Sequence, residues 1–151
     1  MAVDLTTEID ISEVLEVAKN YPGTVTKILK KIGLLTQAEL AREAPVNHGY
    51  LAGSIEKPRV VAEDVVSIHI GANYWTYVAF GTGLHGPHRQ PFDIYPKTAK
   101  VLRFSVGGTT VFARYVKDHP GMQANPFVDR AFDTVETQIE GVVSHFLKEI
   151  L

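Results

Sequence analysis

Apolar residues recur at helical spacing near both ends of this sequence. A short stripe within residues 10–19 and a longer one within residues 24–42 predict two N-terminal helices, and Pro45 ends the second. A third stripe fills residues 126–150, with Asn125-Pro126 as a typical helix start. Its positions follow at steps of four and three residues: Val128, Phe132, Val135, Ile139, Val142, Phe146 and Ile150. So long a stripe predicts a helix that needs a partner to cover it.

Between the helices, apolar and polar residues alternate and predict four strands in two antiparallel hairpins. The first hairpin pairs residues 54–61 with 65–71, and Pro58 suits an edge strand. The second pairs residues 100–106 with 109–116 around a two-residue glycine turn. Its register places Leu102, Phe104 and Val106 opposite Ala113, Val111 and Thr109. We predict one α+β domain, residues 1–151, with N-terminal helices, two hairpins and a long C-terminal helix packed on the sheet.

An aromatic stretch, N-Y-W-T-Y-V-A-F-G-T-G at residues 73–83, joins the two halves. Tyr74, Tyr77, Val78 and Gly81 share helical spacing, so we expect a short helix whose aromatic side chains enter the core. The glycines end it, because glycine accepts the left-handed conformation. A loop with two histidines, one arginine and two prolines follows at residues 84–95.

Charge is distributed unevenly along the chain, although the net charge is only −2. Residues 84–117 hold six bases against one acid, Asp93, whereas residues 1–16 hold five acids and no base. Residues 129–151 are again acidic, with five acids against Arg130 and Lys148. Opposed charges of this kind favour and orient association, so the basic middle of one subunit is expected to meet the acidic ends of another.

The composition restricts the function further. With 151 residues, 45% hydrophobic and 21% charged, the chain is typical of a soluble globular protein. The absence of cysteine excludes disulfides and thiolate metal sites. We expect neither a signal peptide nor a membrane span, and therefore synthesis in the cytoplasm.

Candidate catalytic chemistry is weak. His85 and His88, with Asp118 and His119 brought near by the second hairpin, are the best candidates for a metal site. However, Gly86-Pro87 excludes a helix between them, and the H-E-x-x-H pattern is missing. Neither a nucleophile elbow nor a phosphate-binding glycine loop occurs. We therefore expect no catalytic residue, no cofactor and no metal, and keep a histidine-based metal enzyme only as an alternative.

Nucleic-acid binding is the stronger alternative. The bases of residues 84–117 alternate with Phe92, Tyr95, Phe112 and Tyr115. The cationic side chains of lysine and arginine neutralise phosphates, and aromatic rings stack on nucleobases. The pI of about 6.3 is low for a dedicated nucleic-acid-binding protein, so any contact with DNA is expected to be non-specific.

Four segments, in order, resemble a known family. Y-x-x-Y-V-A-F-G-T (Tyr74–Thr82) resembles the signature of the tail-component, or head–tail connector, morphogenesis proteins of long-tailed DNA bacteriophages. The other three segments are A-P-x-x-x-G-x-L-x-x-S-I (residues 44–55), I-Y-P-K-x-x-K-x-L-x-F (residues 94–104) and H-P-G-x-x-x-x-P-F-x-x-x-A (residues 119–131). This chain departs from the family at Ala79, where an acid is common.

The resemblance implies a structural virion protein, a tail-completion or connector subunit of the neck or head-proximal tail. It further implies a homo-oligomeric ring, expected to be hexameric, in contact with neighbouring neck and tail-tube proteins and near DNA, but with no membrane. A ring needs two unlike surfaces on each subunit. The candidate interface residues are Arg89, Lys97, Lys100, Arg103, Arg114, Lys117, His85 and His88.

Overall fold

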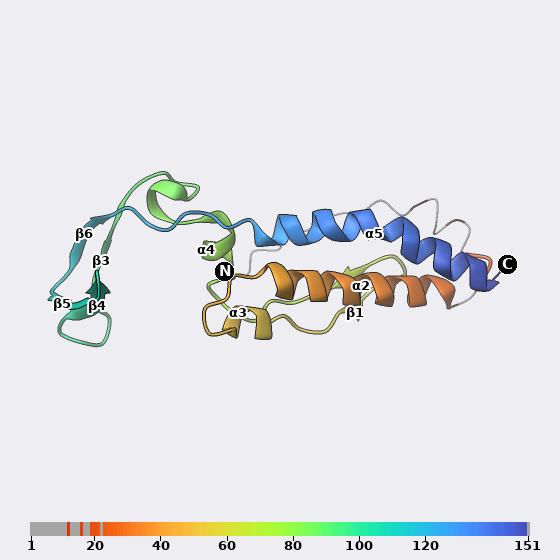
Figure 1. Ribbon diagram of the computed structural model, residues 1–151, viewed down its shortest axis with the longest axis horizontal. Coiled ribbons are helices and arrows are strands. Elements are labelled where there is room, and N and C mark those ends of the chain that lie inside the picture. Colours follow the sequence, from red (N-terminus) through yellow and green to blue (C-terminus); the bar gives the residue numbers. More distant parts are fainter. Residues whose placement is uncertain (1–11, 13–15, 17–18, 22, 151) are drawn as a thin grey trace. The chain divides into compact units, whose positions relative to one another are not determined.

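The computed structural model describes residues 12, 16, 19–21 and 23–150 (Figure 1). Contacts divide the chain into two compact units. The first, called the helical unit here, combines Met1–Trp75 with Pro126–Leu151, and the second, the arm unit, is Thr76–Asn125. The helix predicted for residues 10–19 lies largely outside the described residues.

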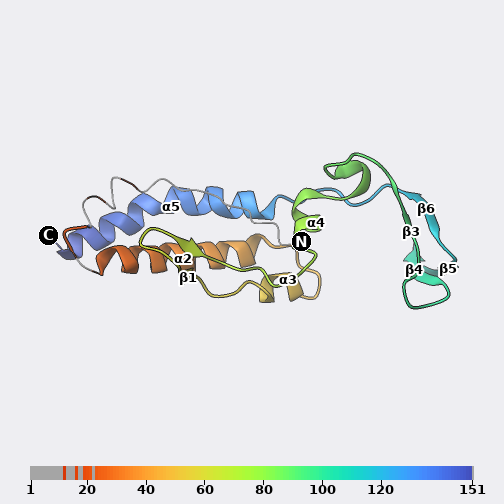
Figure 2. The same ribbon diagram turned by 180° about the vertical axis from the view of Figure 1, so that it is seen from behind.

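Two long helices form the core of the helical unit. Helix α2 spans Thr24–Glu43 and helix α5 spans Phe127–Ile150, close to the predicted ranges 24–42 and 126–150. They lie side by side and antiparallel (Figures 1 and 2). Their facing apolar stripes form one buried cluster: Ile28, Ile32, Val135, Ile139 and Val143. Each stripe thus removes the other from water, which is the main source of helix stability in proteins.

The prediction that the C-terminal helix packs on a sheet is wrong. Helix α5 packs chiefly on α2. The physical reason is that each sheet has only two strands. A ribbon of that width cannot cover a stripe that runs along 24 residues, whereas a helix of 20 residues covers most of it.

A small hairpin packs against α2 in the helical unit. After the short helix α3, Tyr50–Gly53, strand β1 (Arg59–Val60) pairs antiparallel with β2 (Val66–Ser67), and an isolated bridge joins Ile55 to Ile70. The first predicted hairpin is therefore present, but its regular strands are much shorter than residues 54–61 and 65–71. Pro58 immediately precedes β1 and donates no ladder hydrogen bond.

Gly33 explains how the hairpin approaches α2 closely. A Cβ atom on Gly33 would lie 2.6 Å from Cβ of Pro58 and 2.8 Å from Cγ1 of Val66. The sequence predicted close packing as the reason for a glycine inside this helix, and the structure identifies the hairpin as the neighbour.

The arm unit begins at the second residue of helix α4, Trp75–Phe80, and a 3-10 turn follows at Gly83–His85. Strand β3 (Phe92–Ile94) pairs antiparallel with β6 (Val116–His119), and β4 (Leu102–Val106) pairs antiparallel with β5 (Thr109–Ala113). The β4–β5 register is the predicted one, from Leu102↔Ala113 to Val106↔Thr109. The predicted strand 109–116 is interrupted after Ala113, and its last residue belongs to β6.

The chain is thus an α+β protein with helices, small antiparallel hairpins and a long C-terminal helix. The expected burial of the aromatic stretch is wrong, because Tyr74, Tyr77 and Phe80 are exposed and α4 buries Ala79 instead. A helix of only six residues has one narrow buried face, and the small residue occupies it. Within the described residues, no helix has both the length and the apolar character that crossing a membrane requires.

Candidate interaction surface

Two distant glycine motifs meet at the base of the arm unit. The backbone N–H of Thr82 donates to the carbonyl of Met122 at 2.9 Å, and that of Leu84 donates to the carbonyl of Pro120 at 2.8 Å. The N–H of Met122 donates in return to Oγ1 of Thr82 at 2.9 Å. We call these two segments, residues 81–84 and 120–122, the clasp. It joins the segment before strand β3 to the segment after strand β6.

The clasp requires glycine at three positions. Gly81, Gly83 and Gly121 all have positive φ, at 76°, 61° and 87°. Their missing side chains also permit close backbone contact, since a Cβ on Gly83 would lie 2.9 Å from N of Gly121. The structure confirms the predicted left-handed conformation at Gly81 and adds that these glycines hold two backbones against each other.

Asp93 organises the β3–β6 pair. Its Oδ1 accepts a hydrogen bond from the backbone N–H of Asp118 at 2.9 Å, and its Oδ2 accepts one from the hydroxyl of Tyr95 at 3.2 Å. The hydrogen bond to this carboxylate, with its charge, raises the pKa of Tyr95 above its ordinary value of 10.0. The Tyr95 ring stacks on Tyr115 with centroids 5.7 Å apart. Although the pair is short, side chains thus hold its two strands together.

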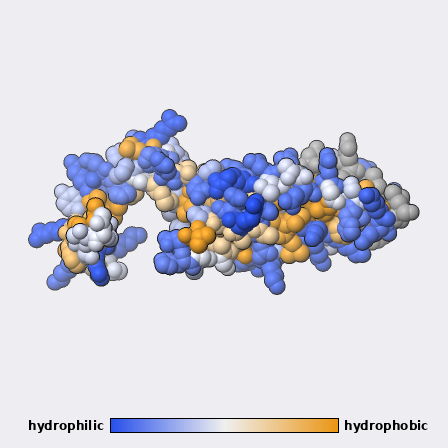
Figure 3. Space-filling model, in the orientation of Figure 1, coloured by the Kyte–Doolittle hydropathy of each residue, from blue (hydrophilic) through white to orange (hydrophobic). Residues whose placement is uncertain are grey.

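The β4–β5 hairpin exposes apolar side chains on both of its faces. Phe104 and Val106 belong to one face, while Phe112, opposite Arg103, belongs to the other. Val106 is 59% exposed and Phe112 is 64% exposed. Figure 3 shows hydrophobic residues at the surface among hydrophilic ones over these strands. Such a ribbon cannot bury its own apolar side chains, so this region is the best candidate for a contact with another molecule.

The six predicted bases are all exposed in the arm unit but do not converge on one point. Arg103 lies on β4 and Lys117 on β6, whereas the others occupy the connecting segments: Arg89, Lys97, Lys100 and Arg114. Lys117 lies 3.8 Å from the carboxylate of its neighbour Asp118, both exposed. None of the other five makes an ion pair with a residue that the structure describes. Together these exposed cations make the surface of the arm unit basic.

The histidines have separate surroundings. His85 ends the 3-10 turn and His88 lies in the next turn, both exposed. His119 is half-buried, its ring packs on Phe92 at 5.4 Å, and its Nδ1 accepts a hydrogen bond from the N–H of Gly121. In the described part of the chain, no three His, Asp or Glu side chains are placed to hold a metal ion. The geometry therefore lends no support to the histidine-based metal site.

Comparison with protein-family models, with curated proteins and with solved structures finds no match to this chain.

Three residues of this surface escaped sequence reasoning. Thr82 and His119 accept backbone hydrogen bonds in or beside the clasp, and Asp93 fixes β3 to β6. A signal existed for Asp93, as the one acid among six bases. Ala79, where the resembling family commonly has an acid, is buried at 5% exposure, so here the position contributes packing.

Proposed function

We propose that this protein is a non-enzymatic structural subunit of a closed ring at the head–tail junction, or at the head-proximal end of the tail, of a long-tailed bacteriophage. The observation that carries the self-associating part of this proposal is the β4–β5 hairpin. This hairpin is only two strands wide and leaves Val106 and Phe112 exposed on opposite faces. A neighbouring subunit can bury those side chains, whereas the hairpin alone cannot.

The phage assignment is supported by where the family-like residues lie in the fold. Ala44, Ile55, Phe127 and Ala131, from two of the resembling segments, are all buried at 6% exposure or less. Gly81 and Gly121, from the F-G-T and H-P-G pieces, have the left-handed conformation that the clasp needs. Part of the resemblance thus consists of framework residues, which is what a shared fold requires.

In this proposal the clasp holds together residues 81–84 and 120–122, and the strands of the arm unit that lie between these segments contact neighbouring subunits. The ring is hexameric by family resemblance and meets further neck and tail-tube proteins above and below. The protein acts in the virion after synthesis in the bacterial cytoplasm. The candidate interface consists of the basic arm residues with His85 and His88 beside them.

The decisive experiment measures the mass of the purified protein across a series of concentrations and salt, with electron micrographs of large species. Rings of one fixed subunit number are expected. The variant Lys97→Glu/Lys100→Glu/Arg103→Glu is expected to assemble less well while keeping its helical circular dichroism. Lys27→Glu/Lys30→Glu/Lys31→Glu is the matched control, because these three lysines are exposed on α2. Equal assembly of the arm variant and the wild type would contradict the proposal.

Binding to a nucleic acid is the second candidate, favoured by exposed Tyr95, Phe112 and Tyr115 among the arm bases. Stacking on such rings and neutralisation of phosphates would bind a single strand with little sequence preference. This function predicts a steep loss of DNA affinity from low to moderate salt. A protein that stays monomeric at every concentration and shows that salt dependence would favour it over the ring.

A further inference from the structure

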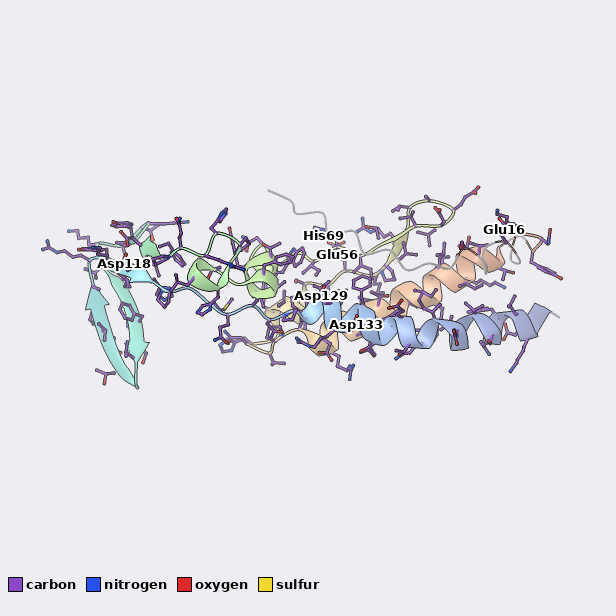
Figure 4. All side chains as sticks on the ribbon, turned by 90° about the horizontal axis from the view of Figure 1, so that it is seen from above. Glu16, Glu56, His69, Asp118, Asp129 and Asp133 are labelled. Atoms are coloured by element: carbon purple, nitrogen blue, oxygen red, sulfur yellow. The ribbon has the colours of Figure 1, made fainter. Side chains whose placement is uncertain are left out.

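One flank of α5 has a continuous row of acidic side chains. Asp129, Asp133, Glu136 and Glu140 follow at steps of four, three and four residues, which places them within about 60° of the helix circumference. All four are exposed, and Figure 4 shows the first two on the initial turns of α5. None makes an ion pair with a residue in the described part of the chain. We call this row the acidic stripe.

The arm has a matching set of cations. Arg103 lies on β4 directly opposite Phe112, so one face of the hairpin combines a guanidinium with an exposed ring. Lys97 and Lys100 precede this strand, and all three cations lack an ion-pair partner among the described residues. The acidic stripe and this face therefore have opposite charge, and neither is compensated by an ion pair with a residue that the structure describes.

The two surfaces are also similar in length and in apolar content. The acidic stripe runs for about 16 Å from Asp129 to Glu140, and β4 spans about 13 Å from Leu102 to Val106. Phe132, only half-buried, is three residues after Asp129 and four before Glu136, so it borders the stripe. An exposed aromatic side chain docked there would find an apolar neighbour between the carboxylates.

We propose that the face of the β4–β5 hairpin with Arg103 and Phe112 docks along the acidic stripe of α5 in a second copy of this chain. This inference rests on the ring-forming function proposed above and names its subunit contact. The contact joins two unlike surfaces of the chain, so a pair of copies still has one free hairpin and one free stripe for further copies. Repetition of such a head-to-tail contact closes a ring when the rotation allows it.

The experiment reverses charge on each surface in turn. Glu136→Lys/Glu140→Lys reverses the charge of the C-terminal half of the acidic stripe, and Glu63→Lys/Asp64→Lys is its matched control in the exposed turn between β1 and β2. Asp129 is left in place because an acid in the first turn favours the helix. The stripe variant is expected to raise the dissociation constant of self-association about tenfold or more, whereas the control assembles like the wild type. Sedimentation velocity at low and moderate salt measures both.

Mixing then tests who contacts whom. The stripe variant and Lys97→Glu/Lys100→Glu/Arg103→Glu should each assemble poorly alone. Mixed in equal amounts, they should co-assemble in alternation, because every contact then joins an acidic arm to a stripe with two lysines, or a basic arm to an acidic stripe. Pairing within one chain predicts no such rescue.

The possible outcomes separate this inference from the proposed function. Normal assembly of the stripe variant would overturn the docking while leaving the ring intact. Failure of the mixture to assemble would also overturn it, since the stripe would then meet something other than the arm of another copy. A wild-type protein that never associates, alone or at high concentration, would remove the self-associating ring and this contact together.

Discussion

Gly83 shows how one residue can hold two distant segments together. Its φ of 61° and its closeness to the backbone of Pro120 and Gly121 both exclude a side chain. The turn glycine Gly107 has a similar φ of 56°, but a Cβ there would have nothing within 4 Å. The two positions therefore separate the effect of conformation from the effect of contact.

We predict that Gly83→Ala opens the clasp and that Gly107→Ala does not. Both bear the left-handed conformation, which costs about 1–2 kcal/mol for alanine. Gly83→Ala adds a collision 2.8 Å from the carbonyl carbon of Pro120, so its total loss of stability is larger. Hydrogen exchange at the amides of Thr82 and Leu84 measures the opening locally. Equal protection of these amides in both variants would show that the contact is unimportant.

The ion pair of Glu43 and Arg130 joins the end of α2 to the start of α5. Nε of Arg130 lies 2.8 Å from Oε2 of Glu43. The hydrogen bond from Arg130 holds the pKa of Glu43 below its ordinary value of 4.5. A carboxyl whose pKa is lowered by folding contributes stability above its unfolded value, and this contribution disappears as the pH falls through the folded value.

Glu43→Gln is therefore expected to lower the melting temperature at neutral pH, and the difference from the wild type should shrink as the pH falls below 4.5. The effect should also weaken in high salt, since the pair is partly exposed. Thermal melts of the wild type, Glu43→Gln, Arg130→Met and the double variant, at neutral pH and below pH 4.5, measure the interaction energy of the pair. A difference that does not vary with pH would assign the loss to packing instead.

Single residues reveal why only part of the clasp could be predicted. The left-handed glycine at Gly81 followed from its place after a helical pattern. Its partners at Pro120–Met122 did not, because a contact between segments so distant in sequence leaves no periodicity for local reasoning to detect. The predicted burial of Tyr74, Tyr77 and Phe80 was wrong for a related reason. Aromatic residues are buried only when a neighbouring element covers them, and these three are exposed.

At the scale of elements, glycines in two helices should respond in opposite directions to the same substitution. Gly33 in α2 contacts Pro58 and Val66, whereas a Cβ on Gly141 in α5 would have nothing within 4 Å. Gly33→Ala is expected to destabilise the protein, because the small hairpin must move away. Gly141→Ala should stabilise it by about 0.5–1 kcal/mol, because alanine has the higher helix propensity. Chemical denaturation measures both, and stabilisation by Gly33→Ala would show that the hairpin yields freely.

Elements with strong periodicity were predictable and short ones were not. Helices α2 and α5 follow from apolar steps of three and four residues, and β4–β5 follows from alternation around Gly107-Gly108. Strand β3 has only three residues, which is too few for alternation to indicate a strand. It pairs antiparallel with β6, and the Asp93 carboxylate adds a hydrogen bond between the two strands. This contact is distant in sequence, so local alternation could not indicate it.

At the scale of the whole molecule, stability is expected to reside in the helical unit, whereas association is expected to depend on both units. The buried cluster belongs to α2 and α5, whereas β4 and β5 place no residue in the buried core. The basic surface could be predicted from charge alone, because exposed lysines and arginines need no tertiary contact. The position of Lys117 on β6 could not, since it depends on how β3 pairs with β6.

The hairpin can therefore be removed to test its role directly. Tyr95 and Tyr115 stack at 5.7 Å, directly beyond the paired residues Ile94 and Val116. Replacing residues 96–114 with Asn-Gly, a two-residue turn, should preserve β3–β6 and the clasp. We expect nearly unchanged helical circular dichroism and melting temperature, with loss of the large species seen for the wild type. The shortened chain should also fail to co-assemble with the stripe variant in place of the arm variant, because it lacks the hairpin that would contact the lysines of the changed stripe. If the shortened protein unfolds, the hairpin stabilises the fold, and if it still forms rings, the subunit contact lies elsewhere.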